Sequence, residues 1–224
     1  MQTQLKGGAA FGHLHITLDP GESILTENGA MQSMDADLDM DATLAGGLGK
    51  ALKRAIFGGE RMVCSSYSNN ASLPKTLTIA PALPGQVVEF PLAPGETLCL
   101  QKGAWLASAG DVNLSTVWAG MASAFAGEGL GKLRAVGGKN GGVLWFSAYG
   151  GMVERQVNGE ILVDGRHLAA YEEGFKLSIG LPGKASTAFF GGEGFVTRIQ
   201  GNGTIWMQTR SVPALAHFLN PRFS

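Results

Sequence analysis

One short box recurs three times along this chain of 224 residues, and such a recurrence constrains the fold more than any other feature of the sequence. The box reads Phe57-Gly58-Gly59-Glu60, then Phe125-Ala126-Gly127-Glu128, then Phe190-Gly191-Gly192-Glu193. Its glutamates are separated by 68 residues (60 to 128) and by 65 residues (128 to 193). This period predicts a single domain built of three repeats, covering about residues 12–83, 84–150 and 151–219.

A second box precedes each of these and predicts a tight turn between two strands. It reads Pro20-Gly21-Glu22, Pro94-Gly95-Glu96 and Asn158-Gly159-Glu160. Pro-Gly suits a type II turn, because proline fixes φ and glycine accepts a positive φ. Asn-Gly instead suits the type I′ turn of a β-hairpin. We therefore expect a chain reversal at all three places.

Short β-rich runs flank these turns and predict an all-β fold. The expected strands are Gly12–Leu18, Ser23–Glu27, Met31–Met34, Lys75–Ala80, Gln86–Leu92, Thr97–Lys102, Trp105–Ser108, Gly142–Ser147, Met152–Val157, Ile161–Asp164, His167–Tyr171 and Gly203–Gln208. Strands of about five residues separated by glycine turns are typical of sandwiches and barrels. The 34 glycines and the low charged fraction of 16% favour the same class.

Apolar residues at helical spacing stand before the Gly-Glu box in the first two repeats. In the run Ala42–Phe57, Leu44, Leu48 and Leu52 recur every four residues. In the second repeat Trp118, Met121 and Phe125 occupy the corresponding place. We expect short helical lids over the ends of the β core. The alternative is a helix that binds a membrane or a partner.

The repeated boxes, together with Ser147-Ala148-Tyr149-Gly150 and Gln208-Thr209-Arg210-Ser211, resemble those of one family. It is the altered-inheritance-of-mitochondria family of mitochondrial biogenesis proteins, in its bacterial branch, and the resemblance runs from about Leu18 to Leu219. It implies a double-stranded β-helix similar to the trp RNA-binding attenuation protein, with three-fold internal pseudo-symmetry. It also implies a homo-oligomer, with a trimer favoured, and by analogy a role in membrane organisation.

His13 and His15 are the residues that suggest a metal. Alternate residues of a strand share a face, so the pair resembles half of a cupin-like metal motif, with Asp19 where a cupin supplies Glu. No second half follows, and the next histidine is His167. Counting back from the turn glycines aligns His15 with Glu89 and Val153, which indicates an ordinary strand position. We therefore favour no metal site, because a catalytic zinc site needs a third protein ligand.

Two sets of carboxylates remain as candidate cation sites. Asp35, Asp37, Asp39 and Asp41 alternate with apolar residues, which predicts a strand with four carboxylates on one solvated face. The run lacks the glycine of a calcium-binding loop. Glu60, Glu128 and Glu193 recur in every repeat, and we expect each to accept hydrogen bonds from turn amides. Whether either set binds a cation is left open by the sequence.

The other residues with distinctive chemistry have structural interpretations. Cys64 and Cys99 lie in apolar runs and predict buried small side chains. Trp105, Trp118, Trp145 and Trp206 have no interleaved basic residues, so core and interface positions are favoured over base stacking. No signal-peptide core and no apolar run of membrane-spanning length occurs, which favours a cytoplasmic protein.

These observations rank three functions. The first is a non-catalytic oligomeric scaffold or interaction protein, a homotrimer with a protein partner or a membrane periphery, with no cofactor, no metal and no catalytic residue. The second is a ring that binds a small molecule or nucleic acid. A net charge of −1 disfavours nucleic acid. The third is a cupin-like metalloenzyme that uses His13 and His15.

Overall fold

The computed structural model describes residues 1–44, 63–101, 103–118, 131–180 and 196–220, without the side chains of residues 43, 44, 117, 118 and 131. Within these ranges antiparallel strands dominate, in one sheet of four strands and one of eleven. The all-β class is confirmed. The strands fall into three successive groups in chain order.

The first group contains seven strands. These are β1 (Gln2–Lys6), β2 (His13–Leu18), β3 (Ser23–Glu27), β4 (Met31–Met34), β5 (Asp39–Leu44), β6 (Val63–Ser68) and β7 (Lys75–Ile79). β7 lies between β2 and β4, and β6 lies between β3 and β5, with every pair antiparallel. β1 adds an edge to β2. The alternation of buried Leu14, Ile16 and Leu18 with half-buried neighbours makes β2 a strand with one core face.

The second group contains β8 (Val87–Leu92), β9 (Thr97–Gln101), β10 (Trp105–Trp118) and β11 (Gly131–Ser147). β11 is long enough to pair with β8 at one end and with β9 at the other, while β10 lies along its other side. The expected strand Trp105–Ser108 is therefore only the start of β10. Trp118, expected in a helical lid, is the last residue of this strand.

The third group contains β12 (Met152–Val163), the 3₁₀ turn η1 (Gly165–His167), β13 (Leu168–Glu172), β14 (Lys176–Gly180) and β15 (Val196–Gln208). β15 pairs with β12 on one side and with β13 and β14 on the other. The helix α3 (Val212–Leu219) follows β15. Among the described helices, none is both long and apolar enough to cross a membrane.

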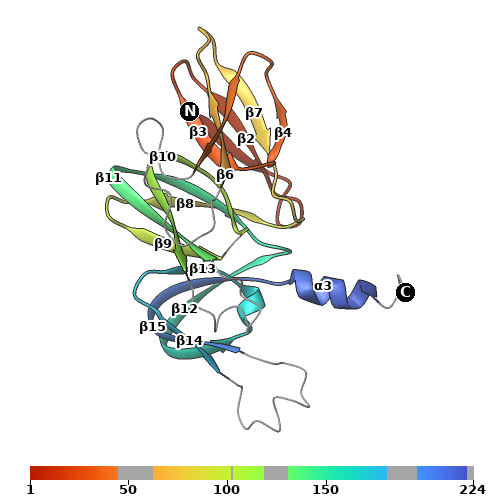
Figure 1. Ribbon diagram of the computed structural model, residues 1–224, viewed down its shortest axis with the longest axis vertical. Coiled ribbons are helices and arrows are strands. Elements are labelled where there is room, and N and C mark those ends of the chain that lie inside the picture. The colour runs from red at the N-terminus through yellow and green to blue at the C-terminus, as the bar shows by residue number, and fades with distance from the viewer. Residues whose placement is uncertain (45–62, 102, 119–130, 181–195, 221–224) are drawn as a thin grey trace.

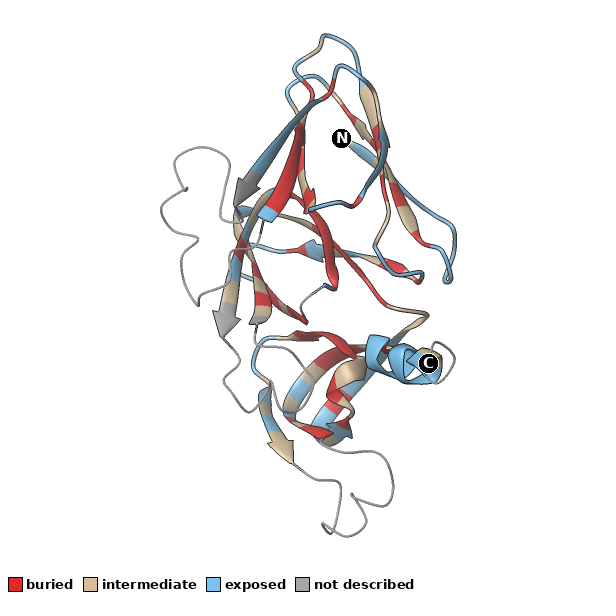
Figure 2. Cartoon of the chain, turned by 45° about the vertical axis from the view of Figure 1, so that its right-hand side comes forward, coloured by how far each residue is buried: buried red, intermediate tan, exposed pale blue. Residues whose placement is uncertain are grey.

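The three groups follow one another along the long axis of the molecule (Figure 1). Backbone pairing continues between them, since β3 pairs with β10 and β9 pairs with β13. Figure 1 therefore shows a stack of groups, whereas we had expected the repeats to close around a central axis. Buried residues occur in the strands of each group (Figure 2).

Two tryptophans join successive groups. Trp145 of β11 is 1% exposed and belongs to the same core cluster as Leu14 and Ile16 of the first group. Trp206 of β15 packs in the second group, with its ring edge-on to Phe90 and Phe146 at centroid distances of 5.4 and 5.9 Å. The expected core role is thus confirmed for Trp145 and Trp206, and also for Trp105, which is 3% exposed.

Two of the three predicted turns form, and their glutamates close them. The Glu22 N–H donates to Asp19 O at 3.0 Å, while the Glu22 carboxylate accepts from the Asp19 N–H at 2.8 Å. Glu96 repeats both bonds to Ala93, at 3.0 and 2.8 Å. Gly21 and Gly95 take φ of 84° and 79°, as a type II turn requires.

The third predicted turn is wrong. Asn158 and Gly159 lie within β12, where they pair in register with Asn202 and Gly201 of β15 without any reversal. The long partner strand explains the difference, because continuous pairing over twelve residues satisfies the backbone groups that a turn would take out of the ladder. Tertiary pairing outweighs the local preference of an Asn-Gly step.

The expected strand from Asp35 to Asp41 forms only in its second half, where Asp39 and Asp41 are exposed residues of β5, and is wrong before it. Ala36 and Asp37 form a turn that carries the chain from β4, in the smaller sheet, to β5, in the larger one. The four carboxylates therefore do not share one face, and three of them have different partners: Asp35 accepts from the Thr76 N–H at 2.7 Å, Asp37 pairs with Lys75, and Asp39 accepts from Asn70 at 2.7 Å. Leu38 is buried at this turn, and its burial fixes the direction in which the chain turns.

The helical lids fall largely outside the described residues. Ala42 to Leu44, the start of the first expected lid, is the end of strand β5, so that part of the prediction is wrong. Leu48, Leu52, Met121 and Phe125 are not among the described residues. The same holds for Glu60, Glu128 and Glu193, so their expected role at turns stays a prediction.

Candidate interaction site at the carboxyl-terminal helix

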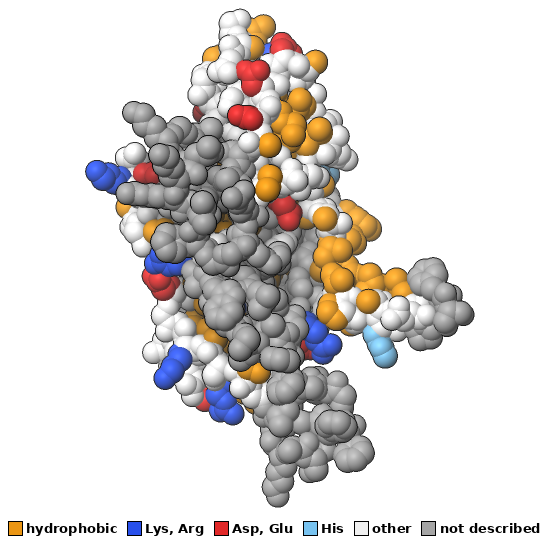
Figure 3. Space-filling view, in the orientation of Figure 1, with side chains coloured by type: hydrophobic (Ala, Val, Ile, Leu, Met, Phe, Trp, Pro, Cys, Tyr) orange, Lys and Arg blue, Asp and Glu red, His pale blue; other side chains and the backbone are white. Residues whose placement is uncertain are grey.

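The helix α3 projects from the side of the body and is exposed along its length (Figure 1). Its sequence, Val-Pro-Ala-Leu-Ala-His-Phe-Leu, contains no Asp, Glu, Lys or Arg. Val212 is 47% exposed and Leu215 is 37% exposed. Figure 3 shows hydrophobic side chains along this projecting arm and on the body beside it. A helix that is apolar on most of its surface is ordinarily buried, so α3 has the composition of an element that packs against something.

The start of α3 is well defined by the sequence. Ser211 caps it, since its side-chain oxygen accepts from the Ala214 N–H at 3.4 Å, and Pro213 lies in the first turn, where no hydrogen-bond donor is needed. Asn220 ends it, with its N–H bonded to Ala216 O. This helix was not predicted from the sequence, although its Ser-x-Pro start and the apolar run after it are signals of a helix.

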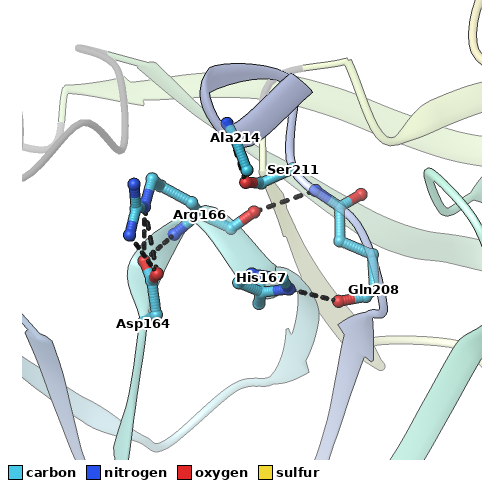
Figure 4. Close-up of polar contacts among 6 residues, drawn as sticks. All are labelled: Asp164, Arg166, His167, Gln208, Ser211 and Ala214. Atoms are coloured by element: carbon cyan, nitrogen blue, oxygen red, sulfur yellow. Dashed lines mark hydrogen bonds and ion pairs between the residues drawn. The ribbon is translucent and has the colours of Figure 1, made fainter. Parts of the chain in front are cut away.

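Gln208 fixes the base of α3 (Figure 4). Its side-chain oxygen accepts from the Tyr149 N–H at 3.0 Å, and its side-chain nitrogen donates to Arg166 O at 2.9 Å. Its own carbonyl oxygen accepts from His167 Nδ1 at 2.7 Å. Because an acceptor faces Nδ1, that nitrogen carries the ring proton. One residue therefore connects the end of β15, the turn η1 and the loop after β11.

A charged pair stiffens the same turn. The Arg166 guanidinium donates to both carboxylate oxygens of Asp164, with distances of 2.9, 3.0 and 2.6 Å (Figure 4). Burial raises the pKa of Asp164, but hydrogen bonds from Arg166 outweigh it, so the pKa lies below its ordinary value. A bidentate pair of this kind holds the η1 backbone, and with it the position of His167.

The loop after β11 brings the three groups of strands together at this base. Gly150 N donates to Pro84 O at 3.0 Å, and Arg210 N donates to Tyr149 O at 3.1 Å. A Cβ on Gly85 would lie 1.9 Å from Ala148 O, so only glycine fits there. The motifs Ser147–Gly150 and Gln208–Ser211, distant in sequence, thus meet in space.

The histidines of the suspected metal motif have protein partners. His15 Nδ1 lies 3.0 Å from Thr78 Oγ1, and His13 Nδ1 lies 3.3 Å from Phe11 O. Among the described residues, no three His, Cys, Asp or Glu side chains are placed to hold a metal ion. The next histidine, His167, has its own partner, Gln208 O, at the base of α3.

The register of the strands corrects the alignment of His15. His15 pairs with Thr78, Glu89 pairs with Trp145, and Glu154 pairs with Trp206. Each glutamate accepts from the indole N–H of its tryptophan, at 2.9 and 3.3 Å. The position aligned with His15 in the third group is therefore Glu154 and not Val153, because Asn158-Gly159 makes no turn. It is a site of cross-strand hydrogen bonds.

Glu27 of β3 is a titratable residue that no sequence motif singled out. Burial raises its pKa to about 7, the direction expected for a carboxylate removed from water. It lies beside Cys64 of β6 in the strand register. Cys64 is buried, as predicted, whereas Cys99 is half-buried, and no disulfide joins these two described residues.

Comparison with known proteins assigns a family to this arrangement. The model of the family described as mitochondrial biogenesis AIM24 matches residues 3–210, so the chain belongs to this family. An uncharacterized protein of Streptococcus pyogenes serotype M6 is 25% identical over 213 residues, which cover 92% of this chain and 84% of that protein. The earlier resemblance to the family is thereby confirmed. The helix α3 begins just after the matched residues.

A solved structure shares the fold. An X-ray crystal structure of a Streptococcus pyogenes protein, determined by a structural genomics consortium, superposes with a TM-score of 0.77 at 24% sequence identity. The alignment covers 99% of each chain. This likeness supports the arrangement of strands and carries no information on activity.

Proposed function

We propose that the protein is a non-catalytic interaction protein, and that α3 is the element through which it binds. The observation that carries this proposal is the exposure of an uncharged, mostly apolar helix on a rigid base. Exposing its side chains to water costs free energy, at about 25 cal/mol for each Å² of apolar surface, which burial against a partner recovers. The helix-in-groove mode of recognition uses residues spaced as Val212, Leu215 and Leu219 are.

We also propose that the domain consists of three copies of one module. The strand pairing supports this. Each group has one or two central strands. A central strand pairs on one side with strands from the start of the group and on the other side with strands that come later. In the first group the centre is β7 and β6, in the second it is β11, and in the third it is β15. A likeness to the double-stranded β-helix of the trp RNA-binding attenuation protein belongs to the same proposal.

The proposed assembly is a homo-oligomer, with a trimer carried over from the family resemblance. Long exposed edge strands favour association, because they carry unpaired backbone groups. Within the described residues, β12 has a partner strand only on its β15 side. A role at a membrane periphery rests on analogy with the family alone.

Photo-crosslinking tests the proposed use of α3. A photoreactive amino acid at Leu215, in the full chain produced in its own cells, should give covalent adducts, either with another copy or with a different protein. The same group at Met40, which is 50% exposed in β5, serves as the control for random collision. Adducts no more abundant at Leu215 than at Met40 would contradict the proposal.

A further inference from the structure

Strand β12 forms a long open edge of the large sheet. Within the described residues it has a neighbouring strand only in β15, at one end of the strand order. It runs for twelve residues, whereas β5 at the other end of the order has six. Most residues of β12 are exposed, and Val153 and Leu162 are exposed by 44% and 43%. A long exposed edge carries unpaired backbone groups and favours pairing with another strand.

The hydrogen bonds around β12 show which of its residues face outward. Antiparallel pairs alternate between residues that exchange both backbone hydrogen bonds and residues that exchange none. Thr209 N donates to Gly151 O at 3.0 Å, and the register then continues residue by residue from Met152 to Val163. The odd-numbered residues of β12 therefore bond to β15, and the even-numbered residues direct their N–H and C=O groups outward. Met152 agrees with this phase, because its N–H donates to the Gln86 side chain at 3.0 Å.

Beyond Met152, five residues direct backbone groups outward, and all five are exposed. They are Glu154, Gln156, Asn158, Glu160 and Leu162. Their spacing is symmetrical about Asn158, so an antiparallel second copy of the same strand can bond to every one of them. Five pairs that each exchange two bonds give about ten backbone hydrogen bonds.

The side chains fit this arrangement. With Asn158 opposite Asn158, Gln156 lies opposite Glu160 of the other copy, which sets an amide donor against a carboxylate. Val153 lies opposite Val163 of the other copy, and Val163 belongs to the core cluster of the third group. The exposed Val153 thereby gains an apolar neighbour, and no like charges face each other directly.

The alternative register is excluded by one charge and one hydrogen bond. Centring the pair on Val157 gives an overlap of the same length. It sets Glu154 opposite Glu160 of the other copy, and like charges directly opposite are destabilising. It also requires the Met152 N–H, which already donates to Gln86.

We infer that β12 pairs with β12 of a second copy of this chain, antiparallel and about a two-fold axis at Asn158. The inference rests on the proposed homo-oligomer, names one contact within it, and is independent of α3. A contact of this kind uses the same surface on both copies and closes on itself, so it covers the edge without forming filaments. Because it joins copies in pairs, a trimer would become a hexamer.

Disulfide crosslinking of the full chain tests the register. Asn158→Cys places the thiols of two copies opposite each other, with Cα atoms about 5.5 Å apart, which suits a disulfide. Glu154→Cys, on the same edge, is the matched control, because its thiols would lie on opposite sides of the axis. Under mild oxidation we expect Asn158→Cys to give at least about tenfold more covalent dimer than Glu154→Cys or wild type, whose Cys64 and Cys99 set the background. Equal yields would overturn the inference.

Charge at Gln156 should change association in both directions. Gln156→Glu sets carboxylates opposite each other at two places in the symmetric contact, and Gln156→Lys sets opposite charges there. We expect the dissociation constant, measured by analytical ultracentrifugation, to rise at least about threefold in the first variant and to fall about threefold in the second. Met40→Glu and Met40→Lys, on exposed Met40 of β5, should assemble like wild type.

Failure of this inference can be told apart from failure of the proposed function. A wild type that stays at the 23.3 kDa of one chain would refute both the pairing and the homo-oligomer. An oligomer with an odd number of copies, or one that responds equally to changes at Gln156 and Met40, would refute the pairing alone. Crosslinks at Leu215 report on α3 and would be unaffected in either case.

Discussion

Glu27 shows how one buried carboxyl couples the fold to pH. Its pKa in the folded protein is raised to about 7 by burial, from an ordinary value of 4.5. The folded state therefore binds more protons than the unfolded state between these two values. Stability contributed by the neutral form is fully present below pH 4.5 and is lost as pH rises through 7.

We expect the melting temperature to fall between pH 5 and pH 8 through this group, and Glu27→Gln to flatten that part of the profile. Glutamine keeps the shape of the side chain and removes its charge. Thermal melts of both proteins across this range test the effect. An equally steep profile in the variant would assign the pH dependence to another group.

Gly85 is a position where a single methyl group is excluded. An added Cβ would lie 1.9 Å from Ala148 O and 2.7 Å from Gly150 N, both backbone atoms that cannot move without disturbing the junction. We expect Gly85→Ala to lower the free energy of unfolding by at least about 2 kcal/mol, as overpacking of this kind does. Denaturant titration measures the change.

Gly180→Ala is its control, because no atom lies within 4 Å of the position of the added Cβ in the described structure and φ is not positive there. This substitution should change stability by less than about 0.5 kcal/mol. Equal losses in the two variants would mean that the close approach at Gly85 does not determine the result.

At the scale of the element, the Pro-Gly-Glu turns show what the glutamate contributes. The Glu96 carboxylate accepts from the Ala93 N–H at 2.8 Å, which closes the turn between β8 and β9. We expect Glu96→Ala to cost about 1 kcal/mol of unfolding free energy, the usual value of such a hydrogen bond. Glu96→Gln retains an oxygen acceptor and should recover most of the loss. If the glutamine variant were as unstable as the alanine variant, the stabilising effect of Glu96 would come from its charge and not from the hydrogen bond that closes the turn.

Prediction from sequence succeeded where the local pattern and the tertiary pairing agree. Met31–Met34 and Ser23–Glu27 form strands at the expected residues, and Pro20-Gly21 and Pro94-Gly95 form turns. It failed where pairing with a distant strand overrides the local pattern. Asn158-Gly159 runs straight because β15 lies alongside it, a partner more than forty residues away in sequence.

The candidate site could be predicted less well than the strands. The apolar residues of α3 are visible in the sequence, but an apolar run normally predicts a buried helix, so its exposure becomes known only from the structure. Gln208 is a similar case. Its motif was noticed, yet its bonds to Arg166 and His167 depend on how η1 lies against β15, and its bond to Tyr149 depends on how the third group packs on the second.

At the scale of the whole molecule, the stacked groups give a long surface instead of a compact ring. Trp145 and Trp206 each pack in the core of the group before their own, so neighbouring groups are not independent. Substitutions at either tryptophan should therefore affect two groups at once. The surface that remains carries charges of both signs in pairs, such as Arg134 with Glu173 and Arg198 with Glu160.

This balance of charge leads to a prediction about nucleic acid. The chain has 17 Lys and Arg against 18 Asp and Glu, a net charge of −1, so we expect it to neutralise few phosphates of a polyanion and to release few of their counterions. Counterion release supplies most non-specific affinity, which is commonly about 10⁻⁴ to 10⁻⁶ M at physiological salt. We expect no binding of single-stranded RNA tighter than about 10⁻⁴ M under these conditions. Fluorescence anisotropy with a labelled oligonucleotide, repeated at several salt concentrations, measures this. Micromolar binding that weakens steeply with salt would instead favour a nucleic-acid-binding protein.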